Sequence, residues 1–207
     1  MQVSHIQGNW QAVTADALIF GVFDAANEIA SAAELSDTLA QAVQTLLSLG
    51  DCTGKLGQVV SSALPAGSAV RRVVLVGLGA QADWCARQFG EACRAAYKAV
   101  AATSATQVVC ALPAVADRPA AWVAEQAVVL AYAQQYVFDA CKSQKSDAPV
   151  WTQLGVYLAD APAPDVDAAL QAGQAIGQAM GFTKTLANLP SNYCTPTYLA
   201  EQAQALL

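Results

Sequence analysis

The fold of this 207-residue chain is decided by one stretch, Val70-Arg71-Arg72-Val73-Val74-Leu75-Val76-Gly77, at the centre of which Val73 to Val76 form an unbroken apolar run. Its apolar side chains do not alternate with polar ones, so both faces of the strand that they predict must be covered. Such a strand lies in the middle of a sheet that has helices on each side. The stretch therefore predicts a central strand of a three-layer α/β fold.

Strands and helices are expected to alternate around this stretch. Apolar patterns and turn residues predict further strands at 15–23, 57–64, 106–112 and 154–159, and helices at 34–49, from Asp83 as cap to about 103, from 117 to 141, and at 166–189. The amino-terminal Met1–Gln7 is expected to be frayed. The order predicts an α/β fold with a mixed, mostly parallel sheet between helices.

Three glycines recur every four residues on the helix predicted at 166–189, namely Gly173, Gly177 and Gly181. Each costs about 1 kcal/mol of helix stability relative to alanine. We expect them where another backbone packs closely against this helix.

Composition narrows the classes of function. Hydrophobic residues make up 55% of the chain and charged residues 13%, with a net charge of -6. Nucleic-acid binding is expected to be weak, because Arg71-Arg72 is the only adjacent pair of basic residues. The amino terminus resembles no secretory signal, and no apolar run is long enough to span a bilayer, so a cytoplasmic protein without membrane contact is expected.

The six cysteines form no Cys-x-x-Cys pair. Cys85 and Cys93 are separated by roughly 12 Å along a predicted helix, which is too far for a disulfide. Together with Phe89, Ala96 and Val100 they form an apolar stripe. We expect buried, reduced thiols that act as small hydrophobic residues.

Two glycine-rich segments invite comparison with nucleotide-binding motifs. Gly77–Ala82 follows a buried strand and precedes a helix, but the acidic residue that would hold a ribose is missing at the required distance, since Asp117 lies too far along. In Gly50–Leu56, one residue is missing between the glycines and Leu56 replaces the magnesium-binding hydroxyl. A tight turn is the preferred interpretation of both segments.

No active site is outlined by the reactive side chains. His5 is the only histidine and lies near the terminus, and no Gly-x-Ser-x-Gly motif is present. Most acids fall at predicted turns and helix starts, where capping explains them: Asp16, Asp24, Asp51, Asp83, Asp117 and Asp160, with Asp165 and Asp167 as the closest pair. We therefore assign no catalytic, cofactor-binding or metal-binding residue.

The segment Leu186–Leu199 carries a family resemblance. Its pattern, Asn-x-Pro-x-Asn-x-x-Thr-Pro from Asn188 to Pro196, resembles the segment that joins the two domains of leucyl (cytosol) aminopeptidases. The resemblance continues upstream in 15–23, 54–57 and 72–79, and covers only the amino-terminal part of such a protein. Lys184 is a departure, because the family's arginine is expected there.

The resemblance implies an amino-terminal, macro-domain-like α/β domain at 1–165, a linking helix and turn at 166–194, and the start of a catalytic domain at 195–207. It further implies a metal-dependent exopeptidase with two zinc or manganese ions, held by a lysine and carboxylates of the catalytic domain, and assembly into a hexamer. Partners would be the chain's own catalytic domain and identical subunits, with peptide substrate bound only by the full-length protein. The 207 residues alone are expected to be inactive.

Two other functions stay open. One is a free-standing macro-like module that binds a nucleotide or ADP-ribose with donors near Gly77–Ala82 and Asp24. The other is DNA binding, known for some members of the family and disfavoured by the net charge. At the chain's end, Leu199, Ala203, Leu206 and Leu207 form an apolar stripe, so this short helix is expected to be frayed or docked on a neighbour.

Overall fold

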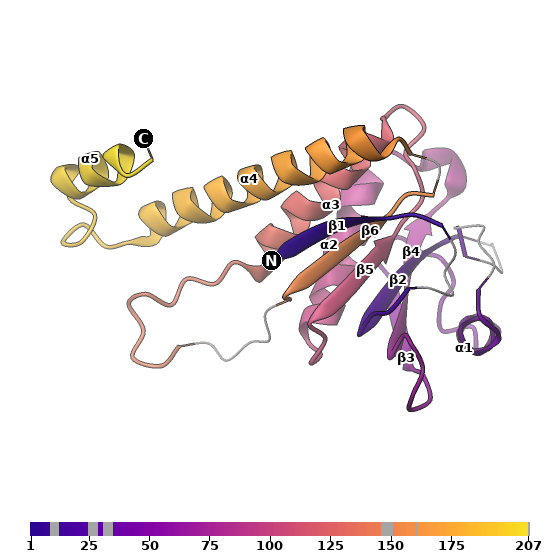
Figure 1. The fold of residues 1–207 in the computed structure, drawn as a ribbon. Coiled ribbons are helices and arrows are strands. Elements are labelled where there is room, and N and C mark those ends of the chain that lie inside the picture. The colour runs from indigo at the N-terminus through magenta and orange to yellow at the C-terminus, as the bar shows by residue number, and fades with distance from the viewer. Residues whose placement is uncertain (9–12, 25–28, 31–34, 146–150, 160, 207) are drawn as a thin grey trace.

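A six-stranded sheet forms the centre of the computed structural model, which describes residues 1–8, 13–24, 29–30, 35–145, 151–159 and 161–206 (Figure 1). In spatial order its strands are β1 (Gln2–Ile6), β6 (Gln153–Tyr157), β5 (Gln107–Ala111), β2 (Ala17–Phe23), β4 (Arg72–Gly79) and β3 (Val59–Ala63). All neighbours are parallel except β3 and β4. The predicted mixed, mostly parallel sheet is confirmed.

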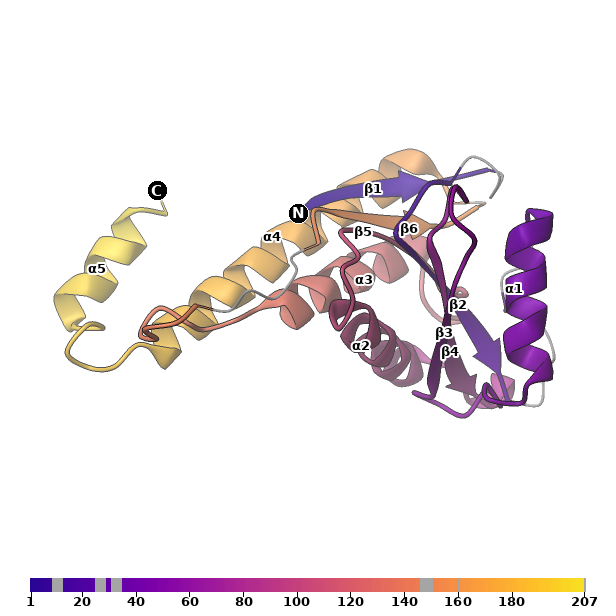
Figure 2. The ribbon, with the colours of Figure 1, turned by 90° about the horizontal axis from the view of Figure 1, so that it is seen from below.

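Helices cover both faces of this sheet (Figure 2). Helix α1 (Asp37–Ser48) lies on one face, and α2 (Ala86–Ala101), α3 (Ala120–Gln135) and α4 (Ala163–Asn188) lie on the other, while α5 (Pro196–Gln204) follows α4 beyond a turn. On β4, Val73 and Leu75 pack with the α1 side, whereas Val74 and Val76 pack with α2 and its neighbours. The three-layer prediction holds because this strand is apolar on both faces.

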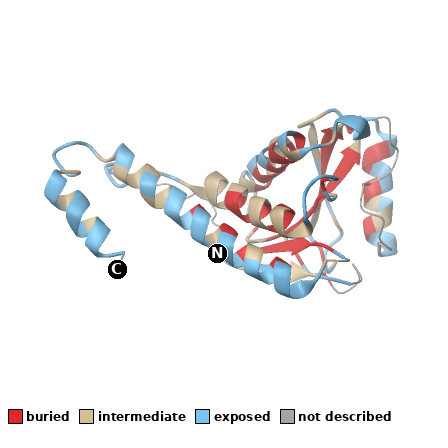
Figure 3. Cartoon of the chain, turned by 90° about the horizontal axis from the view of Figure 1, so that it is seen from above, coloured by how far each residue is buried: buried red, intermediate tan, exposed pale blue. Residues whose placement is uncertain are grey.

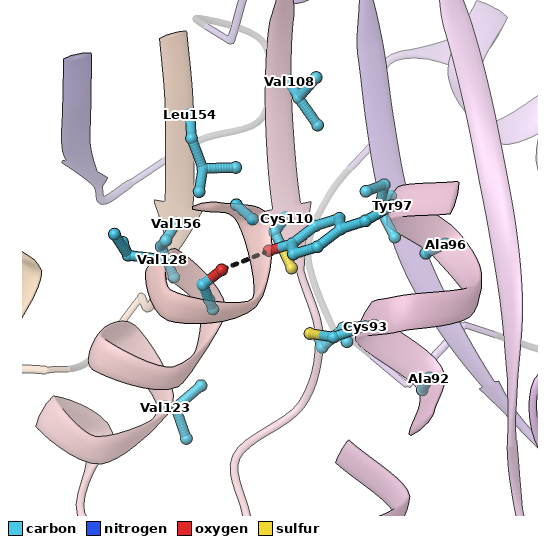
Figure 4. Packing of buried hydrophobic residues seen from close by; sticks show 14 of the residues in the cluster. Ala92, Cys93, Ala96, Tyr97, Val108, Cys110, Val123, Val128, Leu154 and Val156 are labelled. Atoms are coloured by element: carbon cyan, nitrogen blue, oxygen red, sulfur yellow. Dashed lines mark hydrogen bonds between the residues drawn. The ribbon is translucent and has the colours of Figure 1, made fainter. Parts of the chain in front are cut away.

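The hydroxyl group of Tyr97 is buried in the core beneath α2 and α3 (Figure 4). The Tyr97 hydroxyl donates a hydrogen bond to the Ala127 carbonyl oxygen over 3.2 Å, and the Tyr97 ring meets Trp151 edge to face at 5.1 Å between centroids. Burial raises the pKa of both Tyr97 and the adjacent Cys93. Both groups are therefore neutral members of the core at ordinary pH.

Three local predictions were wrong. The amino terminus is the edge strand β1, in which His5 Nε2 lies 3.0 Å from the Leu158 carbonyl oxygen. Asp83 ends a short 3₁₀ helix (Gln81–Asp83), so α2 begins three residues later, after Cys85. Helix α3 ends at Gln135, which leaves Val137 and Cys141 exposed.

All six cysteines are free, as expected, but only some are buried. Cys52, Cys93 and Cys110 lie in the core, whereas Cys85 and Cys141 are exposed and Cys194 is half-buried. The predicted apolar stripe therefore starts at Phe89, one turn later than expected.

Gly173 and Gly177 of α4 pack closely against α3, as predicted, whereas Gly181 does not, since a Cβ atom there would lie 3.7 Å from Tyr136, which follows α3. A Cβ atom on Gly173 would lie 2.7 Å from the Glu125 carbonyl oxygen, and one on Gly177 would lie 2.6 Å from Tyr132 Cβ. Beyond this contact the distal part of α4 projects from the body, and α5 lies at its far end with no buried residue (Figure 3). Thr195 caps α5 by accepting a hydrogen bond from the Tyr198 amide over 3.2 Å.

Candidate functional site

A cavity of about 470 Å³ lies at the carboxyl ends of β5 and β6. Ligands of open α/β sheets bind outside the carboxyl ends of strands, where the following connections diverge to opposite faces. Here the connection after β2 leads to α1 on one face, and the connection after β5 leads to α3 on the other. This cavity is therefore the position at which the fold offers a binding site.

The lining of the cavity is apolar and carries little chemistry. It consists of alanine, proline and leucine with one tyrosine: Ala30, Leu112, Pro113, Ala114, Ala120, Tyr157, Leu158, Ala159, Ala161 and Pro162. The Tyr157 hydroxyl donates a hydrogen bond to the Gly8 carbonyl oxygen over 2.9 Å. These described residues supply shape and main-chain groups, and no carboxylate, thiol or imidazole. The predicted acid Asp160 lies outside the described residues.

In the segment Gly77–Ala82, Gly77 to Gly79 form the end of β4, Ala80 connects the strand to the 3₁₀ helix Gln81–Asp83, and the main-chain amides of the two glycines are already hydrogen-bonded. The amides of Gly77 and Gly79 donate to the carbonyl oxygens of Gln58 and Gly54 over 2.8 Å each. In a dinucleotide fingerprint such glycines let the backbone approach the pyrophosphate. The Gly77 Cα is instead pressed against the Lys55 carbonyl, where a Cβ atom would overlap the oxygen. The two glycines therefore have a structural role, but they lie at the end of β4 and not in the predicted tight turn.

An aromatic cluster lies beside this segment. Trp84 meets Phe23 at 5.7 Å and Phe89 at 6.2 Å between ring centroids, and Phe89 meets Trp122 at 5.6 Å. The Trp84 indole donates to the Ala114 carbonyl oxygen over 2.9 Å. These rings tie the start of α2 to the end of β2 and to the connection after β5.

The second glycine-rich segment, Gly50–Leu56, is a turn. The amide and the hydroxyl of Thr53 both donate to Gln58 Oε1 over 2.9 Å. Strand β3 follows the segment, so the helix amino terminus that completes a phosphate loop is not there.

Asp16 has the richest set of partners among the predicted acids, and it lies at the opposite edge from the cavity, just before β2. Its Oδ2 accepts from the Thr106 amide (2.9 Å), the Thr106 hydroxyl (2.9 Å) and the Gln107 amide (3.0 Å), while Oδ1 lies 3.1 Å from Arg71 Nη1. Burial acts to raise the pKa of Asp16, but the hydrogen bonds and Arg71 prevail and lower it. Asp16 thus holds the start of β5 against β2 and is a structural residue.

The other predicted acids do not converge. Asp24, Asp51, Asp83, Asp117, Asp165 and Asp167 are all exposed, and Asp117 is 3.9 Å from its neighbour Arg118. Within the described parts of the chain, no three side chains among His, Cys, Asp and Glu gather closely enough to hold a metal ion. These residues therefore do not fit a two-metal centre. Nor does any described helix combine the length and apolar character needed to cross a membrane.

Tyr136 holds the end of α4 in place, and the sequence did not indicate this role. It was missed because Tyr136 lies within the helix that was predicted to run to Cys141. Its ring lies beneath Lys184, with Nζ 5.2 Å from the centroid, and its hydroxyl accepts from Asn188 Nδ2 over 3.1 Å and from Thr185 Oγ1 over 3.4 Å. The end of α4 and the turn after it are thereby fixed to the segment that follows α3. Lys184 acts here as a point charge on an aromatic face.

Sequence comparison identifies relatives of this fold. Residues 19–145 match the family described as "Cytosol aminopeptidase family, N-terminal domain". The chain is 37% identical over 205 residues to a probable cytosol aminopeptidase of Ralstonia pickettii, covering 94% of the chain and 40% of that protein. It is 34% identical over 195 residues to one of Burkholderia pseudomallei, covering 92% and 39%. The chain thus spans about two fifths of the length of these curated relatives.

Solved structures show the same fold. A mutant of tomato leucine aminopeptidase matches 99% of the chain with 41% of its own, at a TM-score of 0.78 and 19% identity. The bottromycin maturation enzyme BotP in complex with Mn matches 93% of the chain with 36% of its own, at a TM-score of 0.64 and 22% identity. At these low sequence identities, the structural similarity establishes a shared fold only.

Proposed function

Because the chain belongs to the cytosol aminopeptidase family, whose amino-terminal domain it carries, we propose that it is the non-catalytic part of an enzyme that removes amino-terminal residues from peptides. The observation that supports this most directly is the family match over residues 19–145, which is to the amino-terminal domain. The relatives extend well beyond the two fifths of their length that the chain matches.

In this proposal the chemistry belongs to a catalytic domain that follows these residues. Two divalent ions, zinc or manganese, would be held there and would activate the attacking water. The domain at 1–165 supports the catalytic domain and the assembly of a cytoplasmic homo-hexamer, with the linking segment at 166–194 between them. The dispersed acids of the described chain are consistent with this supporting role.

The test is an activity assay on the purified 21.4 kDa chain. With added zinc or manganese, we expect no hydrolysis of a chromogenic leucine amide, while the full-length enzyme turns it over under the same conditions. Turnover that co-purifies with the monodisperse chain and disappears with chelator would place the active site within these residues.

The comparisons do not favour a free-standing nucleotide or ADP-ribose module, and the engaged amides of Gly77 and Gly79 argue against one. Calorimetric titration with ADP-ribose should therefore give no heat of binding. We also propose that the chain does not bind duplex DNA, because its acidic residues outnumber its basic residues by 16 to 10.

A further inference from the structure

Helix α4 has two faces of different character. The face toward the body is filled, because Val166, Leu170, Gly173 and Gly177 are buried. The opposite face repeats apolar residues at alternating spacings of four and three: Ala168, Ala172, Ala175, Ala179, Phe182 and Leu186, which we call the α4 seam. Its four alanines are exposed and its last two members are half-buried. This spacing is that of a helix that packs along another helix.

The α4 seam also lacks charge. Between Asp167 and Glu201 the chain has a single charged residue, Lys184, and that side chain lies on Tyr136 at the α3 side. A helix face that stays in water normally carries charged and polar side chains. Small uncharged residues instead allow a second helix to approach closely. The α4 seam is therefore suited to pack against an uncharged, apolar helix.

The size of the α4 seam identifies the source of that helix. From Ala168 to Leu186 the helix rises about 27 Å, and a contact strip about 10 Å wide buries roughly 540 Å² over both helices. Stable complexes of separate proteins bury about 1,200 Å² or more, over twice this area, whereas interfaces between domains of one chain start near 600 Å², close to this area. A second copy of the chain could not be held by this strip alone.

We propose that the α4 seam is the surface on which the catalytic domain of the same polypeptide docks through an apolar helix. This rests on the proposed function, in which that domain follows these residues. Because the two domains are covalently linked, the effective concentration is high, and a small uncharged interface is sufficient.

Hydrogen exchange on the full-length enzyme and on the 207-residue chain tests this. We expect amides of residues 175–188 to exchange at least about tenfold more slowly in the full-length enzyme than in the 207-residue chain. The reason is that a docked domain suppresses local unfolding of the projecting part of α4. Ala175→Glu, which places a charge in the α4 seam, should abolish that difference. Gln178→Glu adds the same charge on the exposed polar flank and should preserve it. In the 207-residue chain, both variants should melt within about 2 °C of the parent.

Each contrary result has its own meaning. If the full-length enzyme hydrolyses leucine amides but residues 175–188 exchange equally fast in both proteins, the docking proposal is wrong and the proposed function stands. If the full-length protein has no metal-dependent activity, the proposed function fails. If the 207-residue chain dimerises and Ala175→Glu abolishes the dimer, the occupant of the α4 seam is a second copy.

Discussion

At the scale of single residues, Asp16 is the residue whose contribution to the stability of the fold is most clearly defined. Its carboxylate accepts three hydrogen bonds from Thr106 and Gln107 and pairs with Arg71. We expect Asp16→Asn to lower the free energy of unfolding by about 1–3 kcal/mol at pH 7, because charge-assisted bonds to partly buried donors are weakened. Urea denaturation measures this, and Asp83→Asn at an exposed position should change it by less than about 0.5 kcal/mol.

The same residue predicts a pH dependence. The folded-state pKa of Asp16 is lowered, so the ionised form is stabilised by folding, and this stability is present above the unfolded pKa. It is lost as the pH falls through the folded pKa. The difference between wild type and Asp16→Asn should therefore be constant from pH 5 to 8 and shrink below about pH 4. A difference that grows in acid would show that the carboxylate is not the stabilising form.

A substitution at Gly77 tests whether the glycine at the end of β4 is needed for close backbone packing. A methyl group at this position would overlap the Lys55 carbonyl, whose backbone cannot move without breaking the turn at Gly50–Leu56. Gly77→Ala should thus cost about 3 kcal/mol or more of unfolding free energy. Gly67→Ala is the matched control: its φ is +91°, but a Cβ atom meets nothing within 4 Å, so only about 1–2 kcal/mol is expected. Equal costs would contradict the close backbone approach.

At the scale of elements, the glycines of α4 should respond to alanine with opposite signs. Gly173→Ala places a Cβ atom 2.7 Å from the Glu125 carbonyl oxygen, so α3 and α4 must separate and stability falls by about 1–3 kcal/mol. At Gly181 the nearest atom is 3.7 Å away, on Tyr136, and alanine should stabilise α4 by about 0.5–1 kcal/mol. Thermal unfolding of the two variants measures both changes. Destabilisation by both would mean that α3 and α4 stay in close contact as far as Gly181.

The elements also show which features a sequence can predict. The strands β4 and β5 are apolar on both faces and were recognisable because burial on both sides removes alternation. Strand β1 was missed because an edge strand of five residues, QVSHI, buries too little to show a pattern. The end of α3 was missed because apolar residues keep helical spacing through Val137 and Cys141. The hydrogen bonds that hold the Tyr136 hydroxyl come from residues about 50 positions away, so the local sequence does not show them.

The candidate site shows the same limit. The residues of the cavity come from the connections after β2, β5 and β6, from the last residue of β6 and from the first residue of α3. These segments are far apart in sequence and meet only because parallel strands end at one edge. Their alanines and prolines carry no chemical signature. The family motif at Asn188–Pro196, by contrast, is local, since it is a capped turn whose Thr195 and Pro196 start α5.

At the scale of the whole molecule, stability should fall from the sheet outward. Residues of β2, β4 and β5 are buried, α4 is anchored by α3 over its first half, and α5 has no buried residue. A nine-residue helix is too short to be stable alone, since isolated helices need about 12–15 residues.

In hydrogen exchange of the 207-residue chain, amides of β4 should therefore open only with global unfolding, and those of α5 should be nearly unprotected. The distal half of α4 should lie between the two, because Tyr136 holds it through Lys184 and Asn188. Tyr136→Ala removes that anchor and should bring residues 181–188 close to the exchange rate of α5, leaving β4 unchanged. Protection of α5 equal to that of β4, independent of protein concentration, would mean that α5 docks on its own chain in solution, contrary to its exposed position here.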